Sequence, residues 1–173
     1  NGRPIITLAW KGGLPQTHKE LRNPPRELFK TIDPAKYCLV SIQYTQYNGT
    51  PQENFNKMKA TEAAAQELGA FHYQPAIDDI DEQAAVIAAS DCLVTVAQTA
   101  MHLAGGTSTP CIALIASKPR WDCIGDTDSE MPWWKSITCI RQRGQDWEDV
   151  FKRLNEELEK RYATQTDRAA AAE

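Results

Sequence analysis

Gln98, Thr99 and His102 lie in a stretch that joins two apolar runs, Cys92–Val96 and Cys111–Ile115. This pattern predicts a buried strand, a turn carrying Gln98 and Thr99, a short helix with His102 in its first turns, and a second buried strand. In a parallel pair of strands, the N-terminus of the connecting helix lies at the carboxyl end of the sheet, where its unpaired backbone N–H groups can bind an anion. The sequence therefore predicts a phosphate or nucleotide site here.

Each of these residues has a second, purely structural interpretation. Thr99 and the backbone amides near Ala100 and Met101 can bind a diphosphate through hydrogen bonds and the helix dipole, but Thr99 can also simply cap its helix. The imidazole of His102 can reach the same anion, because helical side chains lean toward the N-terminus. The alternative is a histidine whose polar atoms are satisfied inside the core.

A second glycine-containing loop, Lys11-Gly12-Gly13, follows the apolar run Pro4–Trp10. Without side chains, Gly12 and Gly13 allow backbone N–H groups to approach a phosphate closely, although many glycine pairs are only turns. Thr17, further along the same loop, adds a hydroxyl. This loop is the second candidate phosphate-binding segment.

The remaining elements show how these two loops can meet. Strands are predicted over Pro4–Trp10, Tyr37–Gln43, Phe71–Tyr73, Cys92–Val96, Cys111–Ile115 and Ser136–Ile140. Helices are predicted over Pro25–Thr31, Pro51–Leu68, Glu82–Ser90 with Asp81 as its cap, and from Trp147 to Tyr162. Alternating strands and helices indicate an α/β fold with a doubly wound, Rossmann-like, mostly parallel sheet and strand order 3-2-1-4-5-6.

In that strand order the first and fourth strands are neighbours at the topological switch point, so their loops flank one crevice. The sequence therefore predicts that Lys11, Gly12, Gly13 and Thr17 face Gln98, Thr99, Ala100 and His102.

The acidic turn Ile77-Asp78-Asp79-Ile80 is a candidate for the rest of a nucleotide. Its carboxylates can bind a ribose or a base, while Ile77 and Ile80 are placed to line a nucleobase slot. An acidic cluster before a helix, however, more often caps the helix and contacts solvent.

Composition limits the other possibilities. A chain of 173 residues suits a single domain, expected over residues 1–162 with a flexible tail over 163–173. The net charge of -4 disfavours nucleic acid as a partner, and no apolar run approaches the ~20 residues that span a bilayer. Five cysteines without C-x-x-C spacing indicate a reducing, cytoplasmic location. Because the chain starts at Asn1 rather than Met, we expect a piece of a longer protein.

Several segments together resemble a known family. These are Leu8–Gly13, the stretch from Ile77 to Ala89, Ala97–Gly106, and the later Lys-Pro-Arg-Trp and Met-Pro-Trp-Trp-Lys-Ser-Ile motifs. Over about residues 4–160 the chain resembles the C-terminal domain of GT-B-fold glycosyltransferases, and above all the heptosyltransferase-like domains that follow tetratricopeptide repeats in bacterial proteins. The resemblance implies one half of a GT-B fold.

The resemblance also implies residue roles. Gln98, Thr99, Ala100 and His102 would hold the diphosphate of a nucleotide-sugar donor, with Lys11, Gly12 and Gly13 opposite; Gln43 and Tyr44 would approach the ribose, and Ile77, Asp78, Asp79 and Ile80 the base. In that family the missing N-terminal half supplies the acceptor site and usually the catalytic base. The nucleotide sugar is a substrate, and neither a cofactor nor a metal ion is expected. One departure is that classical heptosyltransferases have Asp-Thr-Gly where this chain has Ala97-Gln98-Thr99.

Two other functional classes remain possible from the sequence. A non-catalytic nucleotide-binding or partner-binding module would use the same fold without transferring a sugar. A Rossmann-like oxidoreductase is disfavoured, because no G-x-G-x-x-G follows the first strand.

Overall fold

The computed structural model describes residues 2–13, 19–45, 47–73, 79–125, 127 and 129–163. The strands are β1 (Ile5–Ala9), β2 (Cys38–Ser41), β3 (Phe71–His72), β4 (Cys92–Val96), β5 (Cys111–Ile115) and β6 (Ile137–Arg141). The helices are α1 (Lys19–Arg22), η2 (Arg26–Thr31), α2 (Pro51–Gln66), α3 (Ile80–Ala88), α4 (Thr99–Gly106), η3 (Trp121–Cys123) and α5 (Glu148–Tyr162), with η2 and η3 of the 3₁₀ type.

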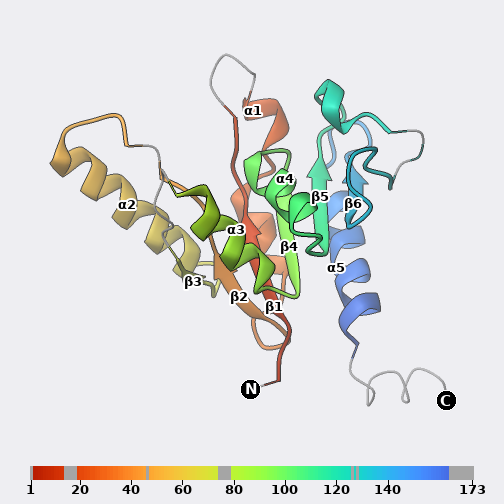
Figure 1. Ribbon diagram of the computed structural model, residues 1–173, viewed down its shortest axis with the longest axis horizontal. Helices are drawn as coiled ribbons and strands as arrows, with labels where there is room; N and C mark the ends of the chain where they lie inside the picture. Colours follow the sequence, from red (N-terminus) through yellow and green to blue (C-terminus); the bar gives the residue numbers. More distant parts are fainter. Residues whose placement is uncertain are drawn as a thin grey trace.

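All six strands form one parallel sheet in the order β3-β2-β1-β4-β5-β6, which confirms the predicted fold class and strand order. The central strand β1 pairs on one side with β2 and on the other with β4, where Ala9 lies beside Thr95. This pairing of β1 with β4 is the topological switch point of the sheet (Figure 1).

Two separate cores cover the two faces of the sheet, because successive side chains of a strand point in opposite directions. On β4, Cys92 and Val94 belong to the core formed with α2, η2 and α5, while Leu93 belongs to the core formed with α3 and α4. Figure 1 shows α3 and α4 in front of the strands and α5 behind them. Strands β4 and β5 are buried throughout, as their uninterrupted apolar sequences predict.

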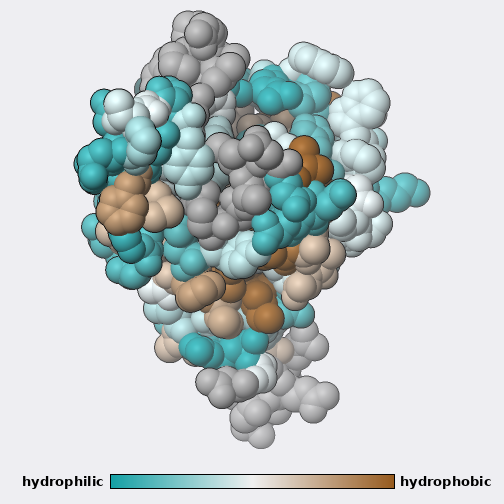
Figure 2. All heavy atoms as spheres, turned by 60° about the vertical axis from the view of Figure 1, so that its left-hand side comes forward, coloured by the Kyte–Doolittle hydropathy of each residue, from teal (hydrophilic) through white to brown (hydrophobic). Residues whose placement is uncertain are grey.

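Helix α2 covers its part of the sheet with few buried residues. It starts with a capping box, in which Thr50 accepts from the Glu53 amide and the Glu53 side chain accepts from Thr50, and only Ala64 and Ala65 are fully buried. Figure 2 brings this side of the molecule forward, and hydrophilic side chains predominate there. Gly69, at φ +71°, ends the segment as the sequence predicts.

Several element boundaries differ from the prediction. Helix α3 begins at Ile80, and Asp79 rather than Asp81 caps it, with its carboxylate accepting from the Glu82 amide at 2.9 Å. The predicted cap at Asp81 is therefore wrong by two residues. The short helix α1 lies in a stretch that was predicted to be a loop, and the predicted helix over Pro25–Thr31 is of the 3₁₀ type.

Helix α5 ends at Tyr162, so the predicted tail beyond Ala163 lies outside the described residues. None of the helices that the structure describes combines the length and the apolar character needed to cross a membrane.

Candidate functional site

The loops after β1 and β4 meet at the carboxyl edge of the sheet, as the strand order predicts. Their contact is close: a Cβ atom added to Gly12 would lie 2.7 Å from Cβ of Gln98. The Gln98 side chain turns inward and donates from Nε2 to the carbonyl of Ala9 and to Oγ1 of Thr95, at 3.0 Å each. Gln98 therefore joins the two loops, and glycine at position 12 leaves the space for it.

A cavity of about 370 Å³ opens beside this junction. Its walls come from five parts of the chain, namely the first turn of α4, the loop after β1, the end of β2, the start of α3 and the segment after β5. The lining residues are Gly13, Tyr44, Asp79, Ile80, Gln83, Ala97, Gln98, Thr99, Ala100 and Arg120. A cleft of this size at a switch point is the usual ligand site of an open α/β sheet.

The first turn of α4 presents free backbone donors to this cavity. The N-cap is Gln98, whose side chain makes no capping hydrogen bond, and the N–H of Met101 already donates to the Gln98 carbonyl at 3.1 Å. The N–H groups of Thr99 and Ala100 have no partner among the residues that the structure describes. Thr99 is thus the first helical residue and not the cap, which removes the structural alternative considered for it. The helix dipole adds partial positive charge at the same place.

Gly13 lines the opposite wall with φ +85°, a conformation that other residues rarely adopt. Asp79 and Ile80 reach the cavity from the start of α3, and Ile80 is 57% exposed, so an apolar surface faces the opening. Of the other residues predicted for this site, Thr17, Ile77 and Asp78 lie outside the described residues.

Lys11 and Gln43 line a second cavity, of about 520 Å³, and are absent from the lining of the first. Gln43 is 4% exposed and closes on the backbone of Lys11: it accepts from the Lys11 amide at 2.8 Å and donates to the Lys11 carbonyl at 3.0 Å. Of the residues that the structure describes, only Tyr44, next to Gln43, lines both cavities. The side chain of Gln43 therefore holds the β1 loop in place.

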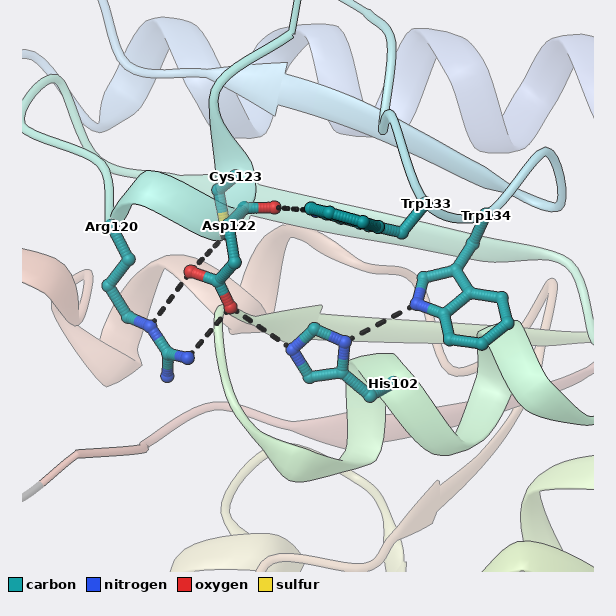
Figure 3. A network of polar contacts seen from close by, with 6 residues as sticks. All are labelled: His102, Arg120, Asp122, Cys123, Trp133 and Trp134. Carbon is teal, nitrogen blue, oxygen red and sulfur yellow. Dashed lines mark hydrogen bonds and ion pairs between the residues drawn. The ribbon is translucent and has the colours of Figure 1, made fainter.

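The imidazole of His102 lies between two hydrogen-bonding partners from the segment between β5 and β6, Asp122 and Trp134 (Figure 3). Its Nδ1 accepts a hydrogen bond from the indole N–H of Trp134 at 3.3 Å, and its Nε2 lies 3.2 Å from a carboxylate oxygen of Asp122. Because Nδ1 is the acceptor, Nε2 carries the proton and donates it to Asp122. His102 is half-buried and outside the lining of the first cavity.

Three residues line the first cavity without having been predicted as site residues, namely Gln83, Ala97 and Arg120, and Arg120 is the charged one among them. Its Nε and Nη2 atoms donate to the two carboxylate oxygens of Asp122 at 3.0 and 2.7 Å. The Asp122 side chain is 7% exposed, whereas the Arg120 side chain is 43% exposed and reaches the cavity. Its position in the sequence is a signal for a site residue, because Arg120 follows β5 and so lies at the same carboxyl edge of the sheet.

The fold is that of one Rossmann-like half of a heptosyltransferase. ADP-heptose heptosyltransferase II of E. coli superposes with a TM-score of 0.55 and 20% identity, over 91% of this chain and 46% of that chain. The E. coli heptosyltransferase WaaC with ADP gives a TM-score of 0.61 and 13% identity, over 90% and 44%. WaaC with ADP-2-deoxy-2-fluoro heptose gives 0.55 and 18%, over 90% and 43%. No protein-family model matches the chain, and no curated protein matches it.

The chain thus spans less than half the length of each of these heptosyltransferases. At such identities the comparison establishes the heptosyltransferase-like fold alone. The function of this chain is therefore inferred from the cavity and the residues that line it.

Proposed function

We propose that this chain is the donor-binding domain of a glycosyltransferase and binds a nucleoside diphosphate sugar in the cavity beside α4. The observation that carries the proposal is the pair of N–H groups on Thr99 and Ala100, which have no hydrogen-bond partner in the described part of the chain and belong to residues that line a cleft at the switch point. Such a helix start suits a diphosphate. Support also comes from the similar fold of WaaC, whose structures contain ADP and an ADP-sugar analogue.

In the proposed complex the diphosphate lies between the first turn of α4 and the backbone of Gly13. Tyr44 and Asp79 are positioned for the ribose, and Ile80 offers apolar surface to the base. Lys11 lies beside this cavity, and His102 and Gln43 support it through the contacts described above.

The chemistry that such a site supplies is stabilisation of the leaving group. As the glycosidic bond breaks, negative charge grows on the departing diphosphate, so fixed N–H donors and a helix dipole act most strongly in the transition state. Gln98 brings no carboxylate to this position, because its side chain is a neutral amide, and that amide is turned toward Ala9.

The proposal extends to the parent protein. We place the acceptor pocket and the catalytic base in the N-terminal half of a bacterial hexosyl- or heptosyltransferase. That half or a tetratricopeptide-repeat region of the parent protein is the proposed partner of this domain. A cytoplasmic location suits the five free cysteines.

The test removes one of the two backbone donors, the N–H group of Thr99. Thr99→Pro deletes the N–H at the first helical position, where proline is tolerated, and Gln98 before it already has the extended backbone that proline requires (φ -154°, ψ -178°). Thr99→Ala is the matched control, because it deletes the hydroxyl but keeps the N–H. Calorimetric titration with ADP, GDP and UDP, and with the corresponding nucleosides, measures the effect.

We expect Thr99→Pro to weaken binding of the preferred nucleoside diphosphate about tenfold relative to Thr99→Ala, and to leave nucleoside binding unchanged. The wild-type chain should melt several degrees higher at a saturating concentration of that diphosphate, since a ligand at 100 times its Kd adds about 2.7 kcal/mol. If none of the nucleoside diphosphates shifts the melting temperature, the proposed function fails.

A further inference from the structure

We propose that Arg120 is a phosphate ligand of the donor cavity and that Asp122 is the residue that positions it. The inference deepens the proposed function, because it rests on the same cavity and adds the charged group that recognises the diphosphate. Neither residue was singled out as a site residue from the sequence.

Arg120 has donors left over for a ligand. A guanidinium group carries five N–H donors, and Asp122 takes up one on Nε and one on Nη2. The remaining donors have no partner among the described residues, and the side chain lines the same cavity as the free N–H groups of Thr99 and Ala100. Among the described residues that line that cavity, Arg120 is the only cationic one and Asp79 is the only acidic one. A planar guanidinium beside two backbone donors is suited to a phosphate.

Several hydrogen bonds hold both the side chain and the backbone of Asp122 in place. It is buried, and its carboxylate accepts two hydrogen bonds from Arg120 and one from His102. Its backbone is fixed as well: the Asp122 carbonyl accepts from the indole of Trp133 at 3.0 Å, and Arg141 donates to the next carbonyl, that of Cys123, at 2.6 Å. Figure 3 shows Arg120, Asp122, His102 and Trp134 linked in one chain of polar contacts.

These polar contacts link the two sources of positive potential in the cavity, the N-terminus of α4 and the guanidinium of Arg120. His102 belongs to α4, three residues after Thr99, and it contacts Asp122, which holds Arg120. The helix start and the guanidinium are thereby fixed relative to each other before any ligand arrives. Such preorganisation reduces the entropy lost on binding and favours an anion that contacts both groups.

The experiment uses calorimetric titration of the chain with ADP, inorganic pyrophosphate and adenosine. Arg120→Lys keeps the positive charge and an ion pair with Asp122 but loses the planar fork, so it should fold. Arg153→Lys is the matched control, since Arg153 also pairs with a carboxylate, that of Asp149, but belongs to α5 on the other face of the sheet. We expect Arg120→Lys to weaken ADP and pyrophosphate binding about tenfold, with adenosine unchanged and Arg153→Lys equal to wild type.

Asp122→Asn tests the positioning role through the sign of its effect. Removing a negative charge near an anion site would strengthen anion binding if only the total charge mattered. If Asp122 positions Arg120, the same substitution weakens ADP and pyrophosphate binding, because the amide cannot accept both guanidinium bonds. Circular dichroism and the melting temperature check that the variant is folded.

The outcomes separate this inference from the proposed function. ADP binding that is unaffected by Arg120→Lys, or strengthened by Asp122→Asn, overturns the inference and leaves the donor site standing. Pyrophosphate binding that depends on Arg120, without binding of any nucleoside diphosphate, supports the inference and overturns the donor assignment. Failure of the wild-type chain to bind pyrophosphate and all three nucleoside diphosphates, ADP, GDP and UDP, overturns both.

Discussion

Four of the five thiols of this chain are chemically protected by their surroundings. Burial raises the pKa of Cys92 to about 11 and that of Cys123 to about 12, and burial also raises the pKa values of Cys111 and Cys139. Only the thiolate is a good nucleophile, so these residues stay unreactive near neutral pH. Cys38, on β2, is the one cysteine that is not fully buried.

We therefore predict that a chromogenic disulfide reagent titrates about one thiol in the native chain at pH 8 and all five after denaturation. The Cys38→Ser variant should be almost silent when native and should release four thiols when unfolded. Rapid reaction of any thiol in the native Cys38→Ser chain would show that one of the buried strands or η3 opens on the timescale of the assay.

Residue types, together with the family resemblance in the case of Tyr44, indicated part of the lining of the first cavity. Gly13, Tyr44, Asp79, Thr99 and Ala100 were expected at the site and line the cavity. Their positions follow from the rule that loops at the carboxyl ends of parallel strands meet. The direction of a side chain within an irregular loop follows from no such rule.

The same limit explains the residues that sequence reasoning placed less well. Gln43, which was expected to approach the ribose, hydrogen-bonds the Lys11 backbone and lines the second cavity. Arg120 escaped notice because its orientation depends on Asp122, a buried partner within a segment that has no periodic pattern.

At the scale of elements, α4 and the segment before β6 pack unusually closely. A Cβ atom added to Gly105 would lie 2.3 Å from Cγ of Trp134, and the Trp134 indole is itself hydrogen-bonded to His102. The indole ring can yield only by giving up that bond. A Cβ atom added to the next residue, Gly106, would meet nothing within 4 Å.

Gly105→Ala should therefore destabilise the chain by about 1–3 kcal/mol, a typical cost of overpacking. Gly106→Ala is the matched control in the same helix and should be neutral or stabilising by up to about 1 kcal/mol, because alanine is the better helix former. Urea denaturation of both variants measures the difference. Equal stabilities would mean that Trp134 moves away at no cost and that its bond to His102 contributes little.

Element types were predictable where the sequence carries a strong pattern. The apolar runs of β4 and β5 predicted their bounds as the structure has them, and the spacing of Val150, Phe151, Leu154 and Leu158 predicted the buried face of α5. The start of α3 was harder, because Asp79 and Asp81 are equally good caps by type and packing decides between them.

At the scale of the whole molecule, one half of a two-half fold can bind a donor without acting on it. In the proposed function, the cavity supplies groups for the leaving diphosphate, and the acceptor pocket and base belong to another half. We predict that the isolated chain binds its nucleoside diphosphate and transfers no sugar. An assay for nucleoside diphosphate released from ADP-, GDP- and UDP-sugars, with water or simple glycosides as acceptors, measures this.

The outcome that contradicts this prediction is turnover by the chain alone above the rate of a Thr99→Pro control. A catalytic base would then have to lie within the residues of this chain, and the proposed division of labour between the two halves would be wrong.

The pairing of β1 with β4 also determines the order in which the parts of the sheet can assemble. Thr95 donates to the carbonyl of Ala9 across 86 positions of the sequence. In contrast, β4, β5 and β6 follow one another in the sequence, with α4 in the first connection and η3 in the second. Closing the long loop costs more chain entropy, so the local unit from β4 to α5 can form before β1 joins it. Because the loop after β1 forms one wall of the cavity, we expect the proposed binding site to form only once this slow step is complete. A bound nucleotide would therefore slow the unfolding of the chain without accelerating its folding.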